Sequence, residues 1–140
     1  MSYLDNFNND FKSKFNNYIT KFPSDSKIWG PGVWWTIHVQ ALHANSKESI
    51  NKYIEYIEFI LPKLPCMKCR NHATEYLSKN RPENYIEFID NDGELTGMFY
   101  WSWKFHNTVN TRLNKDIIDD YYVAKNLYDE DEFCTDDCGN

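Results

Sequence analysis

The sequence predicts an all-α protein built as a four- to five-helix bundle. Apolar and aromatic residues recur every three or four positions along most of the chain, which is the period of a helix with one buried face. No segment shows the strict polar–apolar alternation of an exposed strand, and no strand–helix–strand pattern occurs. The length of 140 residues suits one domain, which we expect at 28–128, between an amphipathic N-terminal helix (1–27) and an acidic tail (129–140).

The first predicted helix carries a stripe of aromatic side chains. They are Phe7, Phe11, Phe15, Tyr18 and Phe22, spaced 4, 4, 3 and 4 residues apart. This spacing places them on one face, with Asn, Asp and Lys on the other. Pro23 and the polar residues after it end the helix. We expect the stripe to dock on the main domain or on a partner.

The second and third helices are predicted from capping signals. The second is expected to begin near Gly30, with Pro31 in its first turn, and to run to about Ala44. Asn45 and Glu48 resemble a capping box that opens the third helix. The buried face of the third helix is predicted from Ile50, Tyr53, Ile54, Ile57 and Ile60.

Two prolines, Pro62 and Pro65, end the third helix. A polar connection with at most one short extended or helical turn is expected over residues 81–94. The remaining helices are predicted at 66–80, 95–115 and 118–128.

Composition excludes several classes of function. The net charge of −6 and the pI near 5.1 argue against nucleic-acid binding, which needs a basic face. No apolar run is long enough to span a membrane, and the N-terminus lacks the pattern of a secretory signal peptide. Aromatic residues make up 17% of the chain, so rings either fill a helical core or line a pocket for a flat ligand.

Four cysteines form two close pairs, Cys66/Cys69 and Cys134/Cys138. A disulfide within either pair closes a very short loop and removes little chain entropy, so stapling is a poor explanation. Cys66 follows a proline at a predicted helix start, where backbone N–H groups, Lys68 and Arg70 favour a thiolate. This environment indicates a dithiol/disulfide redox couple.

Zinc binding is the main alternative for the first pair. Cys66, Cys69 and His72 offer three ligands, which His106 or the tail cysteines would complete. The second pair, a C-x3-C among carboxylates, is poorly suited to this role. The protein would then be a zinc-stabilised helical interaction module without enzymatic activity.

A redox pair needs an electron acceptor, and two predicted helices carry suitable residues. Trp34 and His38 share a face of one helix. His106 and Asn110 share a face of another, with Trp103 and Asn107 alongside. These rings suit a planar heteroaromatic cofactor held in the bundle. His38 taken alone is more typical of a core histidine with satisfied hydrogen bonds.

These residues occur in an order that resembles the Erv/ALR sulfhydryl oxidases over roughly residues 28–128. The family pattern is G-x-x-x-W-x-x-x-H, then C-x-x-C, then H-N-x-V-N followed by a lysine. Here it is Gly30, Trp34 and His38; Cys66 and Cys69; and His106, Asn107, Val109, Asn110 and Lys115. The Asn-, Lys-, Ile- and Tyr-rich composition is similar to that of members from large DNA viruses.

The resemblance implies an FAD-dependent thiol oxidase that acts on dithiol-containing protein substrates. A substrate dithiol would exchange with the Cys66–Cys69 disulfide by attack at Cys66, and Cys69 would pass the electrons to FAD. O2 would then receive them, giving hydrogen peroxide. The resemblance assigns Trp34, His38, His106, Asn107 and Asn110 to the adenine and ribose, with Gly30 and Trp103 in the same site and Lys115 near the phosphates. No metal is implied.

Several expectations follow from the family alone. Members often use a second disulfide as a shuttle, which makes Cys134 and Cys138 candidates beside an incidental or structural role. A homodimer is expected, through the third helix or the N-terminal stripe. A viral member is expected in the virus factory of the host cytoplasm or in the virion. The chain lacks the further cysteine that many members carry after the lysine, and contacts around 126–128 match the pattern poorly.

Overall fold

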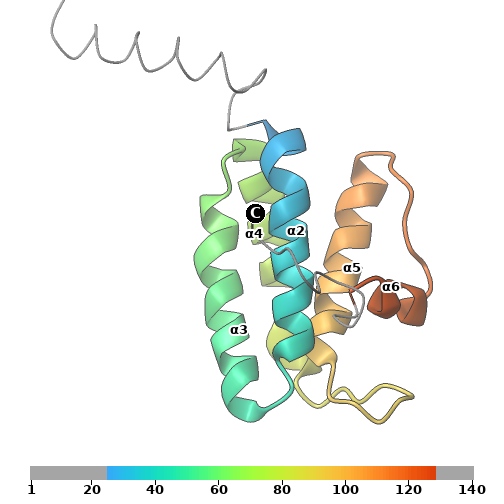
Figure 1. The fold of residues 1–140 in the computed structure, drawn as a ribbon. Coiled ribbons are helices and arrows are strands. Elements are labelled where there is room, and N and C mark those ends of the chain that lie inside the picture. Colours follow the sequence, from blue (N-terminus) through green and yellow to red (C-terminus); the bar gives the residue numbers. More distant parts are fainter. Residues whose placement is uncertain (1–24, 129–140) are drawn as a thin grey trace, which may run out of the picture.

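The structure, a computed structural model, describes residues 25–128 (Figure 1). This part of the chain contains five α-helices, and its only extended pairing is an isolated bridge between Ile89 and Leu95. The all-α prediction is confirmed. The predicted N-terminal helix and the acidic tail lie outside the described residues.

Helix α2 (Ser26–His43) begins a full turn earlier than predicted. Asp25 caps it, because its carboxylate accepts a hydrogen bond of 2.9 Å from Lys27 N. Pro31 therefore lies inside the helix rather than in its first turn, and the prediction of a start near Gly30 is wrong. The helix tolerates Pro31 because only one backbone bond, to the carbonyl four residues earlier, is lost so close to the N-terminus.

Helix α3 (Lys47–Ile60) is opened by a capping box one residue later than predicted. Ser46 N donates to Ser49 Oγ at 2.9 Å, and Ser49 N donates to Ser46 Oγ at 3.2 Å. The predicted pair of Asn45 and Glu48 is wrong, since Ser46 and Ser49 supply both hydroxyls. The predicted apolar face is correct: Ile50, Tyr53, Ile54 and Ile57 are buried, and Ile60 is half-buried.

The second half of the chain carries the remaining elements. They are η1 (Leu61–Lys63), α4 (Met67–Lys79), η2 (Pro82–Tyr85), α5 (Gly97–Arg112) and α6 (Tyr121–Leu127). Figure 1 shows α2, α3 and α4 side by side, α5 beside α2, and the short α6 against the outer side of α5. The long helix is three residues shorter at its end than predicted, and the polar connection contains one short helical turn as expected.

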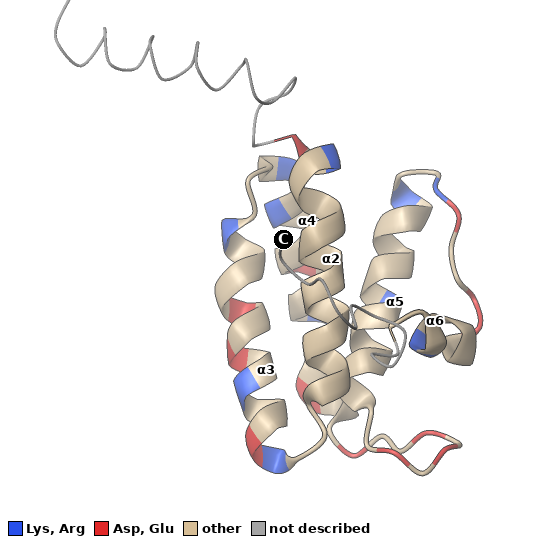
Figure 2. Cartoon of the chain, in the orientation of Figure 1, with Lys and Arg blue, Asp and Glu red and all other residues tan. Residues whose placement is uncertain are grey.

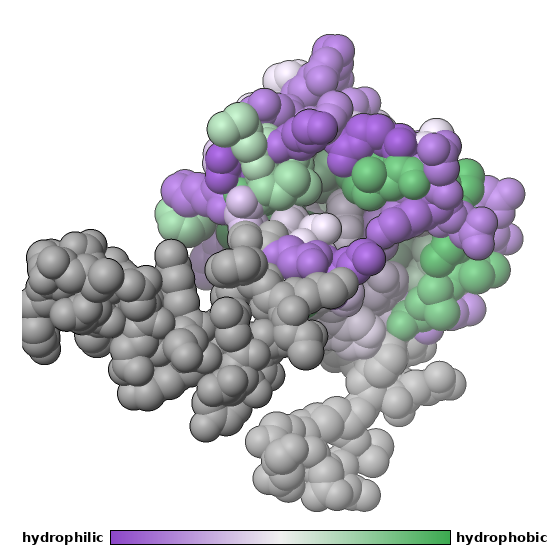
Figure 3. Space-filling view, turned by 90° about the horizontal axis from the view of Figure 1, so that it is seen from above, coloured by the Kyte–Doolittle hydropathy of each residue, from purple (hydrophilic) through white to green (hydrophobic). Residues whose placement is uncertain are grey.

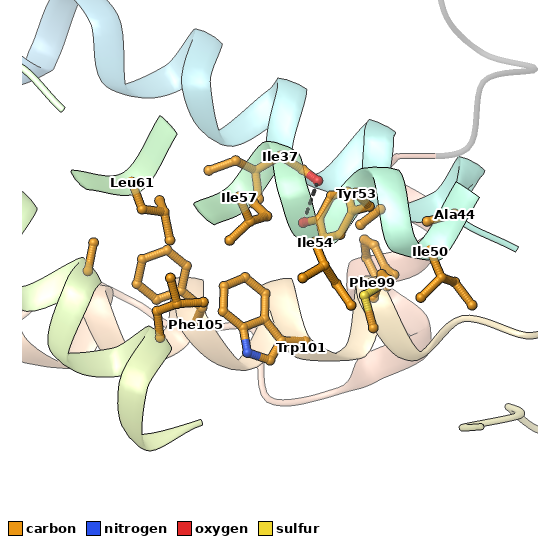
Figure 4. Packing of buried hydrophobic residues seen from close by; sticks show 14 of the residues in the cluster. Ile37, Ala44, Ile50, Tyr53, Ile54, Ile57, Leu61, Phe99, Trp101 and Phe105 are labelled. Carbon is orange, nitrogen blue, oxygen red and sulfur yellow. Dashed lines mark hydrogen bonds between the residues drawn. The ribbon is translucent and has the colours of Figure 1, made fainter. Parts of the chain in front are cut away.

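The core lies between α2, α3 and α5 (Figure 4). Trp101 and Phe99 of α5 are fully buried and pack toward Ile54 and Ile57 of α3. A buried hydrogen bond joins two of these helices, from the Tyr53 hydroxyl to the carbonyl oxygen of Ile37 at 3.1 Å. That bond fixes α3 against α2. It also satisfies a hydroxyl whose burial without a partner would destabilise the folded protein.

A buried charge network ties the loop before α5 to α6. The Asp90 carboxylate accepts hydrogen bonds from the hydroxyls of Thr96 and Tyr121 and from Lys125 Nζ at 2.9 Å. Lys125 also pairs with Asp92 and Glu94. Burial alone would raise the pKa of Asp90, but the bonds from Lys125, from the backbone N–H of Glu94 and from Thr96 hold it below its usual value. The network anchors α6 beside α5.

None of the helices between residues 25 and 128 is both long and apolar enough to cross a bilayer.

Candidate active site

Cys66 and Cys69 form a disulfide at the N-terminus of α4. Cys66 is the N-cap residue of this helix, and its sulfur accepts a hydrogen bond of 3.2 Å from Cys69 N. Both cysteines are partly exposed. When the disulfide is reduced, the same N–H group and the helix N-terminus stabilise a negative charge on the Cys66 sulfur. The two cysteines are therefore chemically unequal, as a redox couple requires.

The segment that presents Cys66 is held in place by Arg70. Arg70 Nη1 donates to the carbonyl oxygen of Leu64 at 2.9 Å, and Arg70 N donates to the carbonyl oxygen of Cys66 at 2.9 Å. Figure 2 shows several Lys and Arg positions at this end of the bundle, while acidic positions lie along α3, on the loops at the other end and beside α6. An anionic thiolate at Cys66 is favoured by this positive surrounding.

Exposed apolar side chains lie on the same end. Phe59 is 64% exposed and Met67, which directly follows Cys66, is 67% exposed. Seen from this end (Figure 3), hydrophobic patches are interrupted by hydrophilic side chains. The surface around the disulfide thus offers both apolar and cationic contacts to an approaching polypeptide.

Deeper in the bundle, His38 of α2 meets two residues of α5. Its Nδ1 lies 2.9 Å from Ser102 Oγ, and its Nε2 lies 2.8 Å from His106 Nδ1. Burial, and then the neighbouring His106, lower the pKa of His38 to about 3. Burial, and then the charge of Lys115, lower the pKa of His106 to about 4. Both imidazoles are neutral at pH 7.

Trp34 stacks directly on His106. The ring centroids are 3.9 Å apart and the planes differ by 2°. A flat ligand has no room between these two rings, so it would have to lie against an outer face of the stack. The sequence predicted that Trp34, His38 and His106 come together, but it did not predict that they pack on one another.

Three other predicted cofactor-binding residues point to the loop after α5. Trp103 Nε1 and Asn107 Nδ2 both donate to the carbonyl oxygen of Ile118, at 2.6 and 2.7 Å. Asn110 Nδ2 donates to the carbonyl oxygen of Asp116 at 3.1 Å. Lys115 lies in this loop, and its backbone N–H donates to the carbonyl oxygen of Asn110. These hydrogen bonds hold the 113–120 loop against α5 and so fix the backbone position of Lys115.

Two open spaces lie along the helices that carry these residues. A cleft of about 440 Å³ between α4 and α5 is lined by rings and basic groups, among them His72, Tyr76, Phe105 and Arg112. This volume lies within the range of about 300–1,000 Å³ that small-molecule sites occupy. In α2, Gly30 is buried, yet a Cβ at this position would have no atom within 4 Å. None of the eight predicted cofactor-binding residues lines the cleft. The Trp34 and His106 rings, the neutral imidazoles and the space beside Gly30 fit a planar ligand that forms hydrogen bonds.

Comparison with protein families matches residues 31–129 to the Erv1 / Alr family, which is well over half of the chain. The chain belongs to the Erv1/Alr family. An FAD-linked sulfhydryl oxidase of African swine fever virus is 37% identical over 105 residues, covering 73% of this chain and 81% of the viral protein. A relative from Invertebrate iridescent virus 6 is 28% identical over 109 residues, covering 72% of this chain and 93% of its own.

Membership of the Erv1/Alr family and the geometry of the two cysteines both argue against the zinc alternative. Cys66 and Cys69 are joined in a disulfide, so neither sulfur is a free thiolate ligand. Among residues 25–128, no three His, Cys, Asp or Glu side chains gather as a metal site would require. His72 lines the α4–α5 cleft instead.

The sequence did not single out two residues that contact the histidines of this Erv1/Alr chain. Ser102 lies four residues before His106, on the same face of α5, and this spacing was the available signal. Tyr128 places its ring 4.6 Å from that of His38. The family pattern matches poorly around 126–128 and did not indicate this contact, which depends on how α6 packs against α5.

Proposed function

We propose that this chain is an FAD-dependent thiol oxidase that forms disulfides in dithiol-containing protein substrates. The observation that carries the proposal is a Cys66–Cys69 disulfide at a helix N-terminus in an Erv1/Alr chain whose viral relatives are named FAD-linked sulfhydryl oxidases. The substrate loses two electrons and two protons as its S–S bond forms. O2 gains both and becomes hydrogen peroxide.

The exchange step follows from the inequality of the two cysteines. A substrate thiolate attacks Cys66, a mixed disulfide forms, and Cys69 leaves as a thiolate. The second substrate thiol then attacks the mixed disulfide, and Cys66 leaves as a thiolate that the Cys69 N–H group stabilises. Arg70 keeps the preceding segment, and thus the Cys66 sulfur, in place throughout.

FAD, when bound, takes the two electrons from the dithiol pair and delivers them to O2. We assign its binding to Gly30, Trp34, His38, Trp103, His106, Asn107, Asn110 and Lys115. The neutral imidazoles offer hydrogen-bonding nitrogens without charge, Gly30 leaves space beside α2, and Lys115 offers a cation for phosphate. The amide side chains set the loop that carries this lysine.

Purification of the protein with its absorbance spectrum tests this function. A yellow protein whose flavin band is bleached by dithiothreitol without oxygen, and restored by air, is the expected result. A colourless protein that carries one zinc ion per chain would establish the interaction module instead. A Cys66→Ala/Cys69→Ala variant is the control, and it should be yellow but resist bleaching.

We propose that Cys134 and Cys138 form a shuttle disulfide that exchanges with Cys66. Their sequence neighbours include Glu132, Asp136 and Asp137, which complement the cationic end of the bundle that carries the active disulfide. The variant Cys134→Ser/Cys138→Ser should slow oxidation of a protein dithiol but not of dithiothreitol. Unchanged oxidation of the protein substrate would end the shuttle proposal.

We propose a homodimer formed through α2 and α3. An apolar groove of about 630 Å³ runs between these helices and is lined by residues such as Ile28, Val33, Phe59 and Leu64. Sedimentation should give a dimer, and Phe59→Asp should give a monomer. The control Ile89→Asp changes an equally exposed apolar residue far from the groove and should remain dimeric.

We also propose that the protein acts in the virus factory or the virion, because its relatives are proteins of large DNA viruses. Proteomic analysis of purified virions and of isolated factories tests this location, and detection in neither would contradict it.

A further inference from the structure

A continuous polar chain crosses from α5 to α2 and back to α5. It runs from Ser102 to His38 and on to His106, with separations of 2.9 and 2.8 Å. Ser102 is fully buried and His38 is 2% exposed. Because water does not reach these groups, each proton in the chain must be shared between protein atoms. The hydrogen bonds from donor to acceptor therefore all run the same way along this series, and the Ser102 hydroxyl determines which way.

The serine hydroxyl sets that direction. Ser102 Oγ lies 2.8 Å from the carbonyl oxygen of Phe99, and a carbonyl oxygen can only accept. The single hydroxyl proton is used there. The Tyr53 hydroxyl, which also pairs with Ser102, donates its own proton to the carbonyl oxygen of Ile37. A serine whose proton is held by the Phe99 carbonyl has a lone pair free for His38, and in that arrangement Nδ1 of His38 carries the imidazole proton.

The direction is passed along the two rings. A neutral imidazole carries one N–H, so Nε2 of His38 is an acceptor, and Nδ1 of His106 is the donor to it. The remaining nitrogen of His106, Nε2, is left with a lone pair. It has no hydrogen-bond partner within residues 25–128, and no side-chain nitrogen in that range is both buried and without a partner. Nε2 of His106 therefore reaches the surface of the site.

We propose that Ser102 is a positioning residue that, through His38, fixes His106 as a neutral hydrogen-bond acceptor at the cofactor site. The inference rests on the proposed function. An acceptor at this point suits a donor on the ligand, such as the exocyclic amine or a ribose hydroxyl of a nucleoside. The opposite tautomer would present an N–H and would suit a phosphate oxygen or a ring nitrogen. The serine thus selects which part of the dinucleotide His106 can bind.

Nitrogen-15 NMR of the histidine rings in the FAD-free protein tests the direction. In the wild-type protein we expect both His38 and His106 to be protonated at Nδ1 and bare at Nε2. In Ser102→Ala the acceptor for His38 is gone, and a buried N–H without a partner is costly. We expect His38 to protonate at Nε2 instead, and His106 to follow.

Ser78→Ala is the matched control, because Ser78 also donates to a carbonyl three residues earlier but touches no histidine. It should leave both tautomers unchanged. Ser102→Thr retains the hydroxyl and should restore the wild-type NMR pattern. FAD affinity, measured by fluorescence, should fall about tenfold or more in Ser102→Ala, the expected effect of a mispaired hydrogen bond.

A wild-type His106 that is protonated at Nε2 would overturn the proposal, whether or not the serine variant folds. Unchanged tautomers in a folded Ser102→Ala protein would do the same. Failure of the proposed function is distinct, because a wild-type protein that binds no FAD would still report its tautomers.

Discussion

Two buried polar networks lie on either side of α5, and they differ in charge and in closure. The network around Asp90 and Lys125 is ionic: the carboxylate and the ammonium hold each other, and their neighbours take up the remaining hydrogen bonds. The network from Ser102 to His106 is neutral, since burial keeps both imidazoles uncharged. Both networks tie α5 to a neighbouring helix.

The difference between the networks indicates which of them serves a ligand. Asp90 accepts from two hydroxyls, two backbone N–H groups and an ammonium, so it has nothing left to offer. The histidine network ends in an unpartnered nitrogen at the surface of residues 25–128. A closed network contributes to stability, whereas an open one is available for binding. The N-terminal end of α4, which carries the Cys66–Cys69 disulfide, also lies away from the closed network, at the other end of the bundle (Figure 1).

The largest expected effect is on turnover, with little effect on stability or FAD content. Cys69→Ser removes the thiolate that we propose passes the electrons to FAD, and we expect turnover to fall about 1,000-fold or more. FAD content and unfolding free energy should change little, because Cys69 belongs to neither network. Oxygen consumption with dithiothreitol measures the loss. Retained turnover would refute the role given to Cys69.

The closed network is broken by Lys125→Met, which leaves the Asp90 carboxylate buried without its cation. We expect a loss of about 3–5 kcal/mol in unfolding free energy, as for other buried ion pairs that lose one partner. Urea denaturation measures this loss. Lys52→Met is the matched control, because its pair with Glu48 is exposed and should contribute less than about 1 kcal/mol. Equal effects of the two variants would contradict the distinction between the networks.

The two networks should lose their contributions to stability in different pH ranges. The pKa of His38 is about 3 in the folded protein against an ordinary 6.5, so the unfolded chain takes up the proton first. Stability is complete above pH 6.5 and falls as the pH drops toward 3, by about 3 kcal/mol at pH 4. Asp90 has a lowered pKa, so its contribution is present above its ordinary value of about 3.9 and is lost only below it.

Urea denaturation of the wild-type protein and of His38→Leu at pH 7, 5.5 and 4 measures how much of the pH dependence of stability comes from His38. The variant should lose less stability over this range than the wild-type protein. Parallel pH dependence in the two proteins would show that His38 is not held neutral.

The smallest expected effect concerns Gly30 and its part in FAD binding. Gly30→Ala adds a methyl group where no atom lies within 4 Å, and alanine is favoured over glycine inside a helix by about 1 kcal/mol. We expect the FAD-free protein to be more stable by up to this amount and FAD to bind more weakly. Gly32→Ala, in the same helix and equally unobstructed, should stabilise the protein without affecting FAD. Unaltered FAD binding in Gly30→Ala would remove Gly30 from the site.

The sequence predicted the helices and the pairing of chemical groups better than the contacts between them. The periodic apolar positions of α3 were found because helical spacing determines which side chains become buried. The start of α2 was misplaced because Pro31 is a strong local signal, whereas the cap at Asp25 depends on one hydrogen bond.

The histidine site shows the same limit. Trp34, His38 and His106 are recognisable by spacing and by family resemblance. Their direct stacking, and the part played by Ser102, depend on how α2 and α5 approach each other, which no local pattern encodes. The partners of Asn107 and Asn110 likewise depend on the path of the 113–120 loop.

The central claim is that electrons pass from a substrate dithiol through Cys66–Cys69 and FAD to O2. The most direct test mixes the FAD-loaded protein with a reduced dithiol protein and measures disulfide formed, O2 consumed and hydrogen peroxide released. We expect equal amounts of all three, and none of them beyond background in Cys66→Ala/Cys69→Ala. Peroxide release that persists in this double variant, or disulfide formation without O2 consumption, would contradict it.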